Sequence, residues 1–80
     1  MTRTHETQRL MLETVIDAQR KTGEDGPMYG ISIAFSDDTP NLDIPFGYEF
    51  DLSYEHFATA TDGIKTVAFD ITHISVVLMT

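Results

Sequence analysis

The feature that most constrains the fold is a change in the spacing of apolar residues near position 23. Over residues 5–21 the apolar side chains recur at helical spacing and form one stripe, made of Met11, Leu12, Val15, Ile16 and Ala18. Gly23 is a suitable C-cap just beyond the helix, and Arg9 and Glu13 stand four residues apart on the outer surface. The pattern predicts a helix that packs one face against the rest of the chain.

After this point apolar residues alternate with polar ones, which is the pattern of strands. Alternation predicts strands over 28–36, 46–54 and 65–79, and a surface loop over 37–45 because that segment contains two prolines and three aspartates. Residues 56–61 fit either a strand or a short helical turn. Asp62-Gly63 predicts a type I′ hairpin. We therefore expect an α+β fold, with an N-terminal amphipathic helix packed on a three-stranded, largely antiparallel sheet, in one domain over residues 1–80.

The last predicted strand changes character near His73, because beyond it both faces become apolar. Either a bulge swaps the faces there, or this end is buried on both sides. A chain of 80 residues without Cys buries a thin core and has no disulfide to stabilise it. We therefore expect a homodimer or higher oligomer whose interface includes Ile74, Val76 and Leu78.

Charge is divided unevenly along the chain. Residues 24–80 hold one Lys against ten Asp and Glu, a formal charge of −9, whereas residues 1–23 carry +1. A surface of that sign repels nucleic acid and anionic lipid and attracts basic protein surfaces. The chain has no apolar leader and no segment long enough to span a bilayer, so we expect a cytoplasmic protein that binds a protein partner, not nucleic acid directly and not a membrane.

The carboxylates that could contact such a partner fall into a strand group and a loop group. Glu49, Asp51 and Glu55 lie on the polar face of the predicted strand, and the preceding loop adds Asp37, Asp38 and Asp43. A face of this kind can replace phosphates in contacts with Lys and Arg, or it can simply keep an oligomer soluble.

Catalytic and metal chemistry find little support in the sequence. On a strand, Asp70 and His73 point to opposite faces, as do Glu55 and His56, so neither pair can chelate one ion. The serines lack an elbow motif, and no glycine-rich phosphate loop is present. The rings of Tyr48, Phe50 and Tyr54 are expected in the core. We expect neither catalytic residues nor a metal nor a cofactor, and hence no enzyme.

The chain is similar in type to small, acidic, Cys-free inhibitors encoded by phages, including anti-CRISPR proteins and restriction antagonists, although no residues match a named family. This similarity implies an inhibitor or regulator that binds the basic, nucleic-acid-binding surface of a partner protein, in the host cytoplasm if the chain is phage-encoded. The alternative is a homo-oligomeric structural or assembly subunit with a solvated acidic face and no catalytic activity.

Overall fold

The computed structural model describes residues 4–80, with side chains from Glu6 onward. One helix is followed by six short strands and one 3₁₀ turn: α1 (Thr4–Asp25), β1 (Ile31–Phe35), β2 (Leu42–Ile44), β3 (Glu49–Asp51), β4 (Phe57–Thr61), β5 (Thr66–Asp70), η1 (Ile71–His73) and β6 (Ile74–Met79). The fold is α+β, as predicted.

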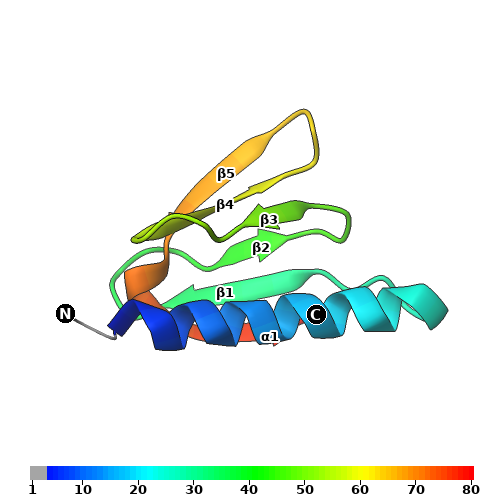
Figure 1. The fold of residues 1–80 in the computed structure, drawn as a ribbon, viewed down its shortest axis with the longest axis horizontal. Coiled ribbons are helices and arrows are strands. Elements are labelled where there is room, and N and C mark those ends of the chain that lie inside the picture. The colour runs from blue at the N-terminus through cyan, green and yellow to red at the C-terminus, as the bar shows by residue number, and fades with distance from the viewer. Residues whose placement is uncertain (1–3) are drawn as a thin grey trace.

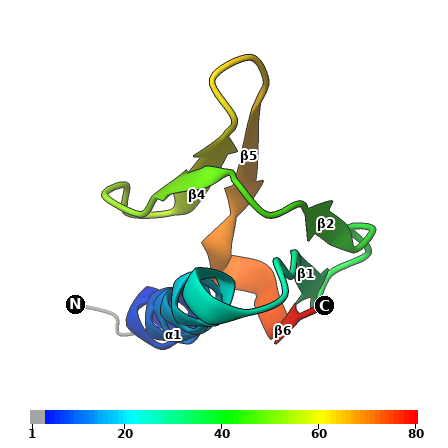
Figure 2. The same ribbon diagram turned by 90° about the vertical axis from the view of Figure 1, so that its right-hand side faces the viewer.

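The strands form two antiparallel sheets, where the sequence predicts one. The first sheet has the order β2-β1-β6 and the second the order β3-β4-β5. The helix α1 lies along the longest dimension of the molecule, which is 40 Å, beside β1 and β6 (Figure 1). Seen nearly along α1, the β4–β5 hairpin rises away from the helix, and the first sheet lies to one side (Figure 2).

The helix buries a narrower stripe than the sequence predicts. Leu12, Ile16 and Gln19 are buried, whereas Ala18 is exposed. Gln19 is tolerated in the interior because its Nε2 donates a hydrogen bond to the carbonyl oxygen of Tyr29 at 2.7 Å. This bond ties the segment between α1 and β1 back to the helix.

Gly23 is inside the helix, which continues to Asp25, so its assignment as a C-cap is wrong. A Cβ atom at Gly23 would lie 2.6 Å from Cε1 of Phe46, too close for the ring to keep its place. The glycine therefore lets the segment between β2 and β3 approach the helix.

The predicted loop over 37–45 contains the edge strand β2, which pairs with β1 through Ile31↔Ile44 and Ile33↔Leu42. The two prolines of this segment, Pro40 and Pro45, lie outside β2, so they remove no hydrogen bond from its short ladder with β1. Conversely, the predicted strand over 46–54 is reduced to β3, and the ambiguous segment 56–61 forms β4.

A hairpin joins β4 and β5 as predicted, but its turn is not type I′, because positive φ occurs at Gly63 and not at Asp62. Instead, one carboxylate oxygen of Asp62 accepts the amides of Ile64 and Lys65 at 2.9 and 2.8 Å. Aspartate thus shapes the turn with its side chain.

The last predicted strand is divided by η1 into β5 and β6, which belong to different sheets. The register with β1 also shifts, so that Ala34 faces Val76 while Phe35 faces Ile74, and Ser75 has no partner in the ladder. This bulge lets Ile74 and Val77 both enter the core although their positions have opposite parity. For the end of the last predicted strand the sequence allowed either a bulge or burial on both sides, and the bulge is confirmed.

The core lies among α1 and the inner faces of both sheets. Its buried apolar residues come from α1 and from every other element except β3, namely Leu12, Ile16, Ile31, Ile33, Ile44, Ala58, Ala60, Phe69, Ile71, Ile74 and Val77. Because β4 contributes only Ala58 and Ala60, the second sheet can pack closely on the rest.

Replacing Gln19 with Leu should lower the free energy of unfolding by about 1–3 kcal/mol, because the carbonyl of Tyr29 would lose its donor in a part-buried place. Urea unfolding measures this loss. Lys21→Leu is the matched control, since Lys21 is exposed on the same helix and Lys and Leu have similar helix propensities. Equal stability of the two variants would contradict a structural role for the Gln19 bond.

Candidate functional site

The solvent side of the second sheet forms a face with carboxylates and no cation. Strand alternation directs Ala58, Ala60, Val67 and Phe69 inward, so their neighbours point outward. We call this surface the outer acidic face; it consists of Glu49, Asp51, Phe57, Thr59, Thr61, Thr66, Ala68 and Asp70. Register places these residues in three rows, Glu49–Thr61–Thr66, Asp51–Thr59–Ala68 and Phe57–Asp70.

The six carboxylates singled out from the sequence do not form one row. Glu49 and Asp51 lie on the outer acidic face, and Glu55 lies in the connection from β3 to β4. Asp43 belongs to β2, and Asp37 and Asp38 lie in the connection from β1 to β2, so all three accompany the first sheet. Half of the predicted set therefore belongs to the second sheet and the connection from β3 to β4.

Several aspartates hold local backbone turns. The Asp51 carboxylate accepts the hydroxyl and amide of Ser53 at 2.6 and 3.0 Å, and these bonds lower its pKa. Hydrogen bonds from the Thr39 side chain and amide lower the pKa of Asp37 in the same way. These groups remain charged at neutral pH while shaping the chain.

Asp70 is a member of the outer acidic face that sequence reasoning missed. Its carboxylate caps η1 by accepting the hydroxyl and amide of Thr72 at 2.6 and 2.8 Å, and its pKa is lowered, chiefly by the hydroxyl bond. The charge of Asp37 opposes this lowering and that of His73 favours it, so the fold brings these three groups within electrostatic reach. The signal that could have found Asp70 is the D-x-T spacing of a capping aspartate.

An exposed pair of aromatic rings stands at the end of the outer acidic face. Tyr54 and Phe57 stack with ring centroids 4.4 Å apart and planes 17° from parallel. They are 42% and 39% exposed, so the expectation of Tyr54 in the core is wrong, whereas Tyr48 and Phe50 are half-buried against it. Phe57 shares its row with Asp70, and Glu55 lies between the two rings in sequence.

Arg9 fixes the connection that carries these rings. Its Nη2 donates to the carbonyl oxygens of Tyr54 at 2.6 Å and Glu55 at 3.0 Å, so it does not form the predicted pair with Glu13. Glu55 and His56 do not diverge as on a strand; Oε1 and Nε2 lie 3.8 Å apart on the surface. Arg9, a basic residue of the helix, thus holds the connection between β3 and β4, which belongs to the acidic part of the chain.

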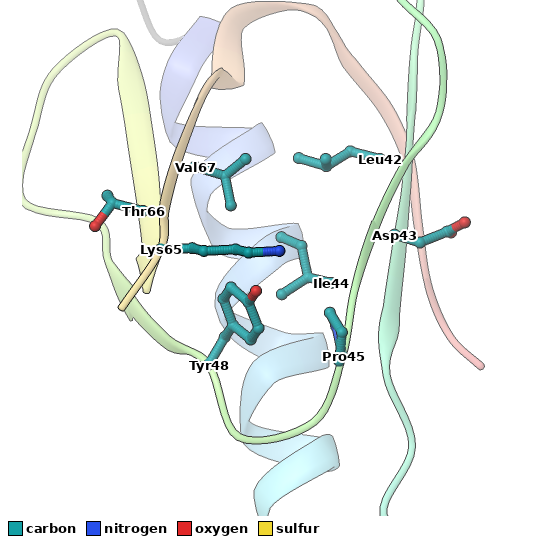
Figure 3. A pocket seen from close by; sticks show the side chains of 8 residues that line it. All are labelled: Leu42, Asp43, Ile44, Pro45, Tyr48, Lys65, Thr66 and Val67. Carbon is teal, nitrogen blue, oxygen red and sulfur yellow. The ribbon is translucent and has the colours of Figure 1, made fainter. Parts of the chain in front are cut away.

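A cavity of about 460 Å³ separates β2 from the start of β5. Figure 3 shows Lys65 extending across it toward Ile44, beside the ring of Tyr48, while Asp43 and Thr66 point away. The walls are mainly apolar, formed by Leu42, Ile44, Pro45 and Val67. Lys65, the only Lys or Arg of residues 24–80, therefore bridges the gap between the sheets, and the outer acidic face contains no Lys or Arg of its own.

The residues proposed for an oligomer interface separate into two environments. Ile74 is buried in the core, whereas Val76 and Leu78 are 42% and 57% exposed on the solvent side of the first sheet. Val76 pairs with Ala34, and Leu78 pairs with Ser32, so small residues lie beside them. An apolar patch therefore remains at β6, which is an edge strand of its sheet.

Among the described residues no three His, Asp or Glu side chains come together in a way that could hold a metal ion. Within the same part of the chain, no helix combines the length and apolar character needed to cross a bilayer. Comparison with protein-family models, curated proteins and solved structures finds no match.

Replacing Asp70 with Asn should lower stability at pH 7 by about 1 kcal/mol, because the neutral amide is a weaker acceptor for the two Thr72 donors than the carboxylate. Because the pKa of Asp70 is lowered in the folded state, the carboxylate stabilises the fold fully above its ordinary pKa of 3.8 and loses this effect as pH falls through the folded-state pKa. The stability difference between Asp70→Asn and the unmodified protein should thus shrink below pH 3.8. Urea unfolding between pH 7 and pH 3 measures it, and a pH-independent difference would contradict the capping role.

Proposed function

We propose that this chain is an acidic protein-interaction module that uses the outer acidic face to bind a basic, nucleic-acid-binding surface of a partner protein. The observation that carries the proposal is the presence of three carboxylates and no cation on one sheet face, with exposed aromatic rings at its end. A continuous face that carries negative charge and lacks positive charge produces a negative electrostatic field, which steers association with a positively charged surface.

The physical basis of inhibition would be competition with nucleic acid. Carboxylates can accept the same charge-assisted hydrogen bonds from Arg and Lys that phosphates accept. A partner occupied by this face would lose its phosphate contacts, and the competition would weaken with salt because both interactions are electrostatic. This is the mode of action implied by the likeness in type to phage-encoded anti-CRISPR and anti-restriction inhibitors.

Binding to a fluorescent nona-lysine peptide tests the location of the acidic site. The double variant Glu49→Gln/Glu55→Gln removes two charges from the outer acidic face and its adjoining connection, and should weaken binding on the order of fivefold at low salt. Asp51 and Asp70 are left intact in this variant because they hold local turns.

The control Glu13→Gln/Glu24→Gln removes the same net charge from the helix, where both residues are exposed. It should change the affinity by less than about twofold if the local field, not the net charge, governs binding. Equal losses in the two double variants would contradict a defined acidic site.

A second candidate, a homo-oligomeric assembly subunit, is favoured by the apolar patch at β6. Val76 and Leu78 are exposed on β6, whose outer edge pairs with no strand among the described residues. An exposed apolar edge strand is a template for pairing with another chain, and natural proteins usually cover or charge such edges. A second copy that paired there would bury these side chains.

Sedimentation equilibrium with Leu78→Asp tests this candidate. If copies associate through β6, the charge should lower the molar mass to that of one chain, because an unpaired carboxylate would be buried in the interface. The monomer should remain folded because Leu78 is exposed in it, whereas Val77→Asp, at a buried position, should unfold the chain. An unmodified protein that already sediments as a monomer would contradict the assembly function.

A further inference from the structure

We propose that the stacked rings of Tyr54 and Phe57 form a receptor for an arginine side chain of the partner. The inference rests on the proposed function, in which the outer acidic face binds a basic surface, and it names the residue type that the end of this face selects. Lysine can satisfy the carboxylates as a point charge, but the rings give a separate reason to prefer arginine.

The geometry of the rings suits a planar cation. With a centroid distance of 4.4 Å and planes 17° from parallel, each ring covers one face of the other, and about two-fifths of each residue remains exposed. A guanidinium can stack on an exposed aromatic face, where the ring quadrupole attracts it, and it is more weakly hydrated than an ammonium.

The backbone that carries the rings is held on both sides. Arg9 binds the carbonyls of Tyr54 and Glu55, and the amide of Ile71 donates to the carbonyl of His56 at 3.1 Å. Phe57 then enters the ladder between β4 and β5. Because the chain is already ordered here, binding would cost little conformational entropy, which is the property of an anchoring site.

The carboxylates near the rings favour a cation and oppose a second copy of this chain. Asp70 shares a row with Phe57, and Glu55, whose side chain is 78% exposed, follows Tyr54 in sequence. The Arg9 guanidinium also lies at this connection, where its Nη2 donates to the backbone carbonyls of Tyr54 and Glu55, and His56 Nε2 lies 3.8 Å from Glu55 Oε1. A copy docking through the same rings would bring these carboxylates against their own equivalents, which like-charge repulsion disfavours. An arginine fits both parts of the site, because its plane stacks on a ring while its N–H groups reach a carboxylate.

The test compares nona-arginine with nona-lysine, which have the same charge, at one salt concentration and with the full chain. In Tyr54→Leu and in Phe57→Leu, the affinity for nona-arginine divided by the affinity for nona-lysine should fall about two- to fivefold. This is the range expected for the loss of an exposed cation–π contact. Tyr54→Phe keeps the ring and should keep the ratio. Tyr29→Leu removes another exposed tyrosine and should leave the ratio unchanged.

Each outcome decides a different point. An unchanged ratio in both leucine variants, with their thermal unfolding intact, would overturn the arginine receptor while leaving the acidic face in place. If neither peptide binds the unmodified protein in a salt-sensitive manner, the proposed function fails and this inference fails with it. A fall in molar mass on Tyr54→Leu would instead assign the rings to contact between copies and overturn the inference.

Discussion

The capped turn at the end of β5 is the interaction on which the rest of the structure depends. Asp70 accepts two hydrogen bonds from Thr72, which bends the chain into η1 and buries Ile71. Without this turn, β5 and β6 would continue as one strand in one sheet. By moving the chain from one sheet to the other, the turn gives each sheet a separate solvent face: the second carries the outer acidic face, and the first carries exposed Val76 and Leu78 together with Asp43.

This arrangement explains how a small chain tolerates an excess of acids. Asp37, Asp51, Asp62 and Asp70 accept local hydrogen bonds that lower their pKa values, so part of the negative charge also forms the turns of the fold. Among the described residues, Glu49 and Glu55 accept no local hydrogen bond of this kind, and both are exposed, on β3 and in the connection that follows it. On the outer acidic face, Asp51 and Asp70 therefore hold turns as well as carrying charge, whereas Glu49 contributes its charge alone.

Sequence patterns predicted the elements that depend on local periodicity and missed those that depend on tertiary contacts. The helix, the hairpin at Gly63 and the outward direction of Glu49 and Asp51 followed from spacing alone. The burial of Gln19 did not, because it requires the carbonyl of Tyr29, and the helical position of Gly23 requires the ring of Phe46.

The candidate site shows the same division. Its carboxylates on β3 were predictable from alternation, whereas Asp70 and the ring pair were not. Asp70 is the last residue of β5, where η1 begins, and Tyr54 lies outside the predicted core in a connection whose backbone is bonded to Arg9 of the helix. The bulge at Ser75 likewise reverses which face of β6 is buried, so that Ile74 enters the core while Val76 and Leu78 remain exposed.

The two candidate functions use different sheets, and this makes them compatible. Val76 and Leu78 lie on the first sheet, while the outer acidic face belongs to the second. Association of two copies through β6 would therefore leave both acidic faces open to a partner. Two linked faces would bind a partner with two basic sites more tightly than either face alone, because the second contact becomes intramolecular. Association of copies would in that case strengthen the proposed binding by the acidic faces and not compete with it.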